Sequence, residues 1–137
     1  MKLVLLSAAL LLLLPAARPE RHQRGSVSVP IAVVVQNLLH NKPSLTFTTS
    51  TADGGILLGG LRRLMKSNAG FTFGYSEHPD YGPFLESVNG LAGSDRDRTY
   101  WELLVRTADG RLLRPDVGIG CYVPKPKDQI ILNFTRW

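Results

Sequence analysis

Side chains that could do acid–base, nucleophilic or metal chemistry occur along the chain, but none stands in a motif that assembles a reactive site. The carboxylates show no paired spacing for general acid–base work; they are Asp80, Glu86, Asp95, Asp97 and Glu102. The three histidines fall in unrelated segments and form no HxxxH pair; they are His22, His40 and His78. A phosphate-binding GxxxxGK[ST] loop, a GxGxxG turn after a strand and a nucleophile elbow are also absent from the sequence. The residues therefore favour a binding protein over an enzyme, and they predict no metal site.

Two polar features carry possible covalent chemistry. The single cysteine, Cys121, cannot close an intrachain disulfide or build a zinc site of several cysteines. It is either a buried or inert small residue or the origin of an intermolecular disulfide in an oxidising compartment. Asn133 begins an Asn-Phe-Thr sequon, and its glycosylation requires that its side chain face solvent.

Composition places these residues in one folded domain with mild positive charge. The chain has 137 residues, of which 44% are hydrophobic and 20% charged, which excludes a disordered polymer. Its formal charge of +5, from 16 Lys and Arg against 11 Asp and Glu, is too small for a dedicated nucleic-acid binder. The one basic cluster, at 62–66, is explained by a solvated helix face, with a weak contact to an acidic partner left open.

The amino-terminal segment predicts secretion. Met1 and Lys2 precede an almost purely apolar run from Leu3 to Leu14, followed by small residues, which is the layout of a signal peptide over residues 1–17. The run of about 12 residues is shorter than the ~20 that span a bilayer, which disfavours the alternative of a membrane anchor. Residues 18–25 then form a flexible leader, and the mature chain is expected to be secreted, with no membrane segment after cleavage.

The remaining residues, 26–137, alternate between short strand patterns and turns. Strands are expected at 26–35, 45–50, 71–75, 84–88, 99–106, 117–123 and 129–135. Pro30 places the first strand at a sheet edge or at a bulge, and a turn is expected at 41–44. Helical spacing follows from Ile56 to Lys66. These elements predict an α+β fold, a small and mainly antiparallel β domain with one helix.

Two stretches are distinctive. The segments are Asp-Tyr-Gly-Pro-Phe-Leu-Glu-Ser-Val-Asn-Gly-Leu-Ala at 80–92 and Asp-Arg-Thr-Tyr-Trp-Glu-Leu-Leu at 97–104. In their sequence and spacing they closely resemble the C-terminal β-domain of the cobalamin carriers, a family that includes transcobalamin, haptocorrin and gastric intrinsic factor. The ending at 131–137 is similar to the Asn-Phe-Thr plus aromatic ending of intrinsic factor. The resemblance covers residues 26–137, nearly the whole mature chain.

The resemblance implies a secreted, non-enzymatic corrinoid-binding protein in cobalamin transport, with cobalamin or a related corrinoid as ligand and no catalytic cofactor. Carriers of this family hold cobalamin between a helical barrel and the β-domain. By position, the ligand-facing candidates are Asp80, Tyr81, Gly82, Pro83, Phe84, Leu85, Trp101, Glu102, Leu103 and Leu104. Their aromatic and aliphatic side chains suit a flat corrin ring, and their polar groups suit its amide rim. His78, beside Pro79, is assigned to a surface loop and not to cobalt.

Several alternatives stay open. The barrel has no counterpart in this sequence, so binding is expected to be weaker unless the chain dimerises or meets a barrel-bearing or receptor protein. The alternative function is a secreted protein-interaction module that has lost high-affinity corrin binding and uses the same apolar strip. Tyr100 and Trp101 face opposite sides of their strand, and either one belongs to the core. Residues 81–83 either contact ligand or serve only as a turn.

Overall fold

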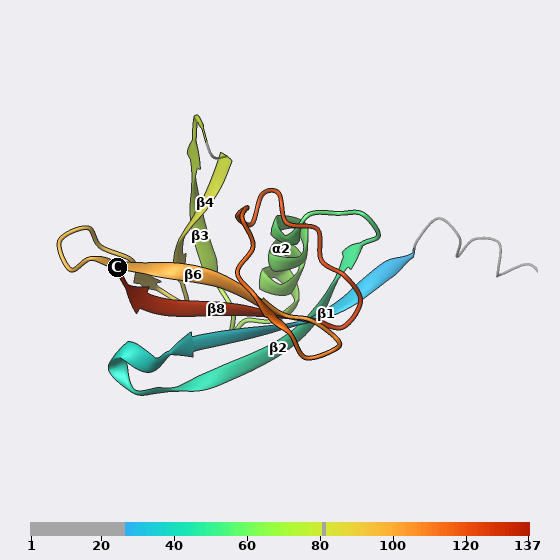
Figure 1. Cartoon of the computed structure of the whole chain (residues 1–137), viewed down its shortest axis with the longest axis horizontal. Coiled ribbons are helices and arrows are strands. Elements are labelled where there is room, and N and C mark those ends of the chain that lie inside the picture. The colour runs from blue at the N-terminus through green and yellow to red at the C-terminus, as the bar shows by residue number, and fades with distance from the viewer. Residues whose placement is uncertain (1–26, 81) are drawn as a thin grey trace, which may run out of the picture.

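The computed structural model describes residues 27–80 and 82–137, so the predicted signal peptide and leader lie outside the described residues. Strands dominate this part of the chain (Figure 1). In order the elements are β1 (Ser28–Asn37), η2 (Leu38–His40), β2 (Lys42–Ala52), α2 (Leu57–Ser67), β3 (Phe73–His78), β4 (Gly82–Val88), β5 (Leu91–Ala92), β6 (Thr99–Arg106), β7 (Leu112–Leu113) and β8 (Asp128–Arg136).

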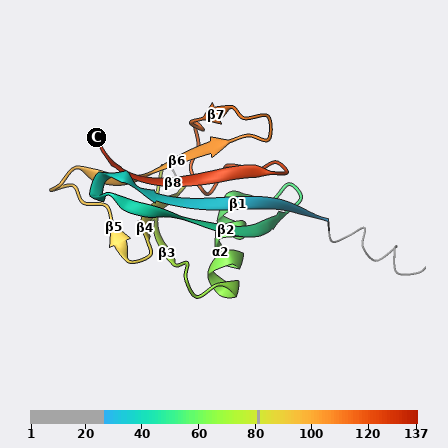
Figure 2. The same cartoon turned by 90° about the horizontal axis from the view of Figure 1, so that it is seen from below.

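The strands form two sheets. The large sheet has the order β2-β1-β8-β6-β7, and the small sheet has the order β3-β4-β5. All neighbours pair antiparallel except β1 and β8, which are parallel and lie side by side in the middle of the large sheet (Figure 2). This arrangement confirms the predicted α+β class with mainly antiparallel pairing.

The hydrophobic core lies between the large sheet on one side and α2 with the small sheet on the other. Alternate residues of the three inner strands point into it because side chains on a strand change face at every residue. These core residues are Val29, Ile31, Val33 and Val35 of β1, Trp101 and Val105 of β6, and Ile130, Leu132 and Phe134 of β8. The facing layer contributes Leu57, Leu61 and Leu64 of α2, with Leu85 and Val88 of β4.

The amino end of α2 is capped by backbone groups of the loop between β7 and β8, which is distant in sequence. Ile56 stands at the N-cap position and its side chain makes no capping hydrogen bond. The backbone N–H groups of Leu57 and Leu58 instead donate to the carbonyl oxygens of Tyr122 and Ile119, at 2.8 and 2.9 Å. Free N–H groups at a helix start need such partners, and here tertiary contacts supply them.

This loop corrects one prediction. The apolar segment at 117–123 was expected to be a strand, but it forms bends and turns between β7 and β8. Ile119 is buried in the core, which explains the apolar composition. Its carbonyl oxygen serves the helix and not a neighbouring strand, so the segment joins neither sheet.

The first two strands correct two more predictions, one on Pro30 and one on the turn at 41–44. β1 is an inner strand, and Pro30 is neither at an edge strand nor at its bulge, which falls between Val35 and Asn37. The carbonyl oxygen of Pro30 accepts from Lys127, just before the pairing with β8 begins, so the missing N–H faces a gap in the ladder. The expected turn at 41–44 lies earlier, in η2 and Asn41, because β2 already begins at Lys42.

Candidate functional site

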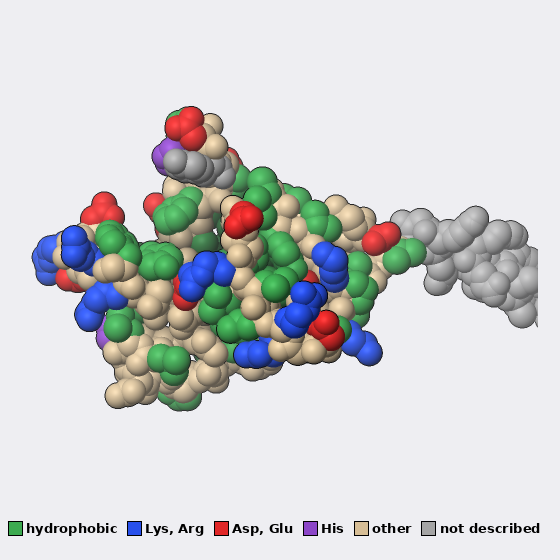
Figure 3. All heavy atoms as spheres, in the orientation of Figure 1, with side chains coloured by type: hydrophobic (Ala, Val, Ile, Leu, Met, Phe, Trp, Pro, Cys, Tyr) green, Lys and Arg blue, Asp and Glu red, His purple; other side chains and the backbone are tan. Residues whose placement is uncertain are grey.

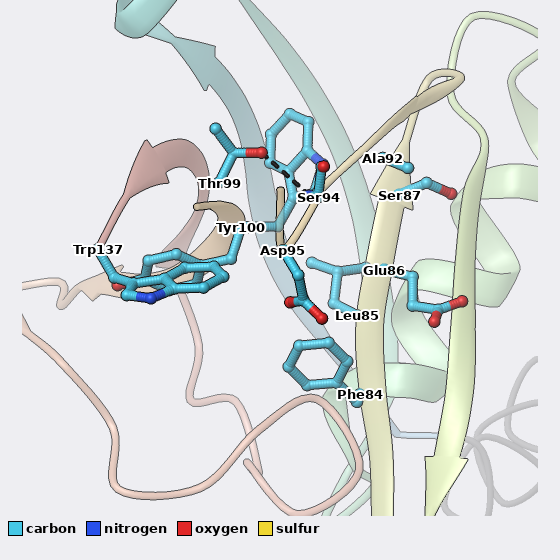
Figure 4. A pocket seen from close by; sticks show the side chains of 12 residues that line it. Phe84, Leu85, Glu86, Ser87, Ala92, Ser94, Asp95, Thr99, Tyr100 and Trp137 are labelled. Carbon is cyan, nitrogen blue, oxygen red and sulfur yellow. Dashed lines mark hydrogen bonds between the residues drawn. The ribbon is translucent and has the colours of Figure 1, made fainter. Parts of the chain in front are cut away.

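β4 and β6 belong to different sheets and line one cleft. The cleft has a volume of about 710 Å³, and residues of β5, the loop after it and Trp137 also line it. Figure 4 shows the aromatic side chains of Tyr100 and Trp137 on one wall and Phe84 on the other, with Asp95 between them. The remaining lining residues are Leu85, Glu86, Ser87, Ala92, Gly93, Ser94, Thr99 and Trp101.

The two walls offer exposed aromatic surface. Phe84 is 50% exposed and Trp137 is 58% exposed, which is unusual for rings of this size. Trp137 packs edge-on against Tyr100, with ring centroids 6.0 Å apart, and its backbone N–H donates to the carbonyl oxygen of Arg98. The terminal aromatic is thus held in place at the cleft instead of trailing into solvent.

Trp101 forms the floor between the sheets. It is 5% exposed, and its indole Nε1–H donates to the carbonyl oxygen of Leu91 in β5 at 2.8 Å. Its ring packs against Phe134, with centroids 5.0 Å apart. Of the two neighbouring aromatics, Trp101 is therefore the core residue, and Tyr100 points the other way. Trp101 joins the two sheets and leaves little surface for a ligand.

A second hollow of about 240 Å³ shares Phe84, Leu85, Tyr100 and Trp101 with the first. Pro83 and Leu103 also line it, and the loop at 114–119 forms its far side. Close packing holds this loop against β4: a Cβ atom placed on Gly120 would lie 2.5 Å from Cδ of Pro83. The two candidate stretches, separated in sequence, thus meet along one continuous groove.

The edge of β6 inside the groove lacks a strand partner over residues 100–104. β7 pairs only with Val105 and Arg106, and Ser94 bridges only Thr99. Thr99 and Thr107 direct their backbone N–H groups away from β8, as their bonds to Ser94 and Arg111 show. Because backbone direction alternates along a strand, Trp101 and Leu103 present their N–H and C=O groups to the groove.

Glu102 and Leu104 lie on the opposite face of the large sheet from Trp101, as their alternation in β6 requires. Glu102 nevertheless lines the second hollow together with Arg114, whereas Leu104 lines neither hollow. The Glu102 carboxylate is paired with Arg114, and it accepts a hydrogen bond from Nδ2 of Asn133 at 3.1 Å. Asn133 is half-buried, and its Oδ1 is buried without a partner. Glycosylation of Nδ2 would require the bond to Glu102 to be given up, so modification of Asn133 stays a prediction.

The remaining candidates lie near the tip of the β3–β4 hairpin, which stands clear of the rest of the surface (Figure 3). Asp80 is exposed, and its backbone N–H donates to Nδ1 of His78. His78 is exposed as predicted, but it is the last residue of β3 and not part of a loop. Gly82 has a φ of +73°, which a side chain at this position would resist. Tyr81 lies outside the described residues. Neither Asp80 nor Gly82 lines the two hollows.

Sequence reasoning missed part of the cleft. Trp137, Asp95, Ser94 and Glu86 line it but were not candidates. For Trp137, the sequence offered one signal, the aromatic ending shared with intrinsic factor. That likeness did not indicate where the Trp137 side chain lies in the fold. Strand alternation predicted that Tyr100 and Trp101 face opposite sides but not which of them is buried. The packing of Trp101 in the core shows that Tyr100 is the residue that faces outward.

The groove has the chemistry of a binding site. Aromatic rings, unpaired backbone groups and two exposed carboxylates, Glu86 and Asp95, can contact and orient a ligand. Within residues 27–80 and 82–137, no group of three or more His, Cys, Asp and Glu side chains could hold a metal ion. No helix in the same residues is long and apolar enough to cross a membrane. Cys121 is exposed, which rules out a buried thiol.

Known proteins with similar sequences include cobalamin binding intrinsic factor and Transcobalamin-1. The chain is 27% identical over 124 residues to cobalamin binding intrinsic factor of dog (Canis lupus familiaris), covering 88% of this chain and 28% of the relative. It is 30% identical over 95 residues to human Transcobalamin-1, covering 66% and 20%. The chain thus spans between a fifth and about 28% of the length of these relatives. No protein-family profile matches the chain.

Solved structures agree on the fold. Haptocorrin in complex with Cbi superposes with a TM-score of 0.69 at 20% identity, covering 82% of this chain and 26% of haptocorrin. A candidate metal binding protein from Ruminococcus gnavus gives 0.56 at 16% identity, covering 80% and 98%. Two packed sheets with one helix and a groove between them define the class, a small α+β domain of the haptocorrin type. Together with the sequence relatives, this fold makes the chain similar to the cobalamin carriers, with a transcobalamin-like domain over the matched residues.

Proposed function

We propose that the protein binds a corrinoid in the groove between β4 and β6, as a secreted, non-enzymatic protein of cobalamin transport. The observation that carries the proposal is the convergence of the two distinctive stretches. Residues 83–85 and 101–103 come from different sheets, yet they line the same hollow. Relatives named for cobalamin binding support the ligand class.

The groove suits a flat ring with an amide rim. Phe84, Tyr100 and Trp137 offer aromatic surface for the apolar face of the ring. The outward N–H and C=O groups of Trp101 and Leu103 can bond rim amides, which carry both donors and acceptors. Both hollows are open on one side, so this domain covers only part of a corrin, and a barrel-bearing or receptor protein would complete the enclosure.

The test is a titration of the purified protein with cyanocobalamin and cobinamide, followed by heat and corrin absorbance. Phe84→Ala and Trp137→Ala remove exposed rings and should each weaken binding about tenfold with little change in stability. Leu112→Ala, at a similarly exposed apolar position outside both hollows, is the matched control. Trp101→Ala is unsuitable because that residue is buried in the core.

Saturable binding that is lost in the cleft variants and kept in the control supports the proposal. Absence of binding at high micromolar ligand rejects it and favours the alternative, a secreted interaction module whose exposed rings at Phe84 and Trp137 meet a protein partner. A secretion assay with and without residues 1–17 tests the predicted signal peptide separately, and retention of the full chain in the cell would contradict it.

A further inference from the structure

The outer edge of the large sheet is a second surface with unused binding capacity. β2 runs for 11 residues along this edge, and no described strand pairs with it on the side away from β1. The N–H of Asp53 donates to the carbonyl of Val27, so the odd residues of β2 direct their backbone groups toward β1. By alternation, Thr46 and Thr48 direct theirs outward, and both residues are exposed.

Charge within the two elements at this edge is one-sided, although the exposed Asp53 follows β2 directly. β2 and α2, which pack together, contain four basic residues and no acidic one; the basic residues are Lys42, Arg62, Arg63 and Lys66. Figure 2 shows α2 lying beside β2. These two elements together therefore carry a local charge of +4 from their four basic residues. Arg62 leans toward the Tyr75 ring, whereas Arg63 reaches Oγ of Ser50 on β2 at 3.1 Å.

The same charges decide between possible occupants. An open edge can pair with the edge of a second copy, and proteins often block this with basic residues or proline. Here Lys42 and Pro43 stand at one end of the edge, and Arg63 stands at the other. An antiparallel pair of β2 strands centred on Phe47 would bring Lys42 of each copy near Arg63 of the other. Like charges disfavour that dimer, but they attract an acidic segment.

We propose that the edge of β2 at 44–49, flanked by Lys42 and Arg63, binds an extended acidic peptide segment of a partner protein, which adds to the large sheet as a sixth strand. Backbone hydrogen bonds from Thr46 and Thr48 supply the pairing, and the basic residues select the charge. This surface lies outside the two hollows, so the proposal does not rest on corrinoid binding.

The probe is a capped peptide of about ten residues with alternating Glu and Thr, which has strand propensity and remains soluble. Three matched peptides are compared by fluorescence anisotropy with the full protein: the probe, the same sequence with alternate backbone nitrogens methylated, and a Lys–Thr version. We expect saturable binding of the probe only, at least about tenfold weaker for the methylated and Lys peptides, and weakened by added salt.

Two variants locate the site. Thr48→Pro removes an outward N–H and should lower probe affinity at least about tenfold, while circular dichroism and the unfolding midpoint report whether the fold is intact. Arg63→Gln should lower it about threefold or more, whereas Arg96→Gln, equal in charge change but in the loop before β6, which is three strands from β2 in the sheet, should not. Equal binding of the methylated peptide, equal effects of the two arginine changes, or no binding at millimolar peptide would overturn the proposal. So would a dimer in sedimentation that Thr48→Pro dissolves and the probe does not displace.

Discussion

The contact between Gly120 and Pro83 makes a prediction whose size can be worked from the geometry. A Cβ atom on Gly120 would lie 2.5 Å from Cδ, 2.7 Å from Cγ and 3.2 Å from Cβ of Pro83. The proline ring is rigid, so the loop at 114–127 must move away from β4. Forced packing of this kind costs about 1–3 kcal/mol of stability. Replacing glycine by alanine also removes freedom from the unfolded chain, which returns about 0.4–1 kcal/mol.

Gly118 in the same loop provides the matched control, since its Cβ would lie 3.6 Å from the Pro83 carbonyl oxygen, an ordinary contact. Gly118→Ala should therefore be neutral or stabilising by up to about 1 kcal/mol. Gly120→Ala should lower the free energy of unfolding by about 1–2 kcal/mol. The entropic gain is common to both variants, so their difference of about 1–3 kcal/mol isolates the clash.

Urea unfolding followed by fluorescence of the two tryptophans measures both variants. With a denaturant slope of about 1–3 kcal/mol per molar for a small domain, the midpoint of Gly120→Ala should fall by about 0.3–2 M. A Gly120→Ala midpoint equal to or above that of Gly118→Ala would refute the argument. It would mean that the loop moves off Pro83 without cost, and the second hollow would then have no fixed wall.

Three further predictions concern other described residues. Trp101→Ala should lower the free energy of unfolding by about 3–5 kcal/mol, because it empties a buried site and leaves the Leu91 carbonyl without its donor; a loss below about 1 kcal/mol in urea unfolding would contradict this. Burial and the bond to Asp128 raise the pKa of Tyr122. The unfolded tyrosine ionises from about pH 10 while the folded one stays neutral, so stability should fall as pH rises above about 10; Tyr122→Phe should flatten that fall, and equal slopes would be evidence against it. Cys121 is exposed, so a thiol reagent should label it in the folded protein at the rate of a free thiol; protection until unfolding would disagree with its position.

Local patterns predicted the strand at 99–106 correctly because its aromatic and β-branched residues agree with its place in the sheet. The segment at 117–123 has similar residues, yet its backbone partners are at the start of α2, and composition contains no information about distant partners. The predicted strand boundaries differ from the observed ones for the same reason. β2 begins at Lys42, before the predicted start at residue 45, because β1 supplies a partner along its whole length.

The candidate site was predicted in part. Resemblance brought together 80–85 and 101–104, and the structure places Pro83, Phe84 and Leu85 along one groove with Trp101, Glu102 and Leu103. The resemblance could not predict that Trp101 is buried between the two sheets or that Glu102 is paired with Arg114. Both features depend on contacts between segments that are distant in sequence. That the ligand is a corrinoid and that these residues contact it stay predictions.

The parallel pairing of β1 with β8 has a consequence for how the chain must fold. Ile31 lies opposite Asp128, so the centre of the large sheet joins segments almost a hundred residues apart. Closing so long a loop costs entropy before the contact stabilises anything, and folds with such distant pairings form slowly. During synthesis the hairpin of β1 and β2 is made before β8, so the inner edge of β1 has no partner until β8 follows. In that interval a valine-rich strand that is buried in the folded protein is open to pairing with other chains.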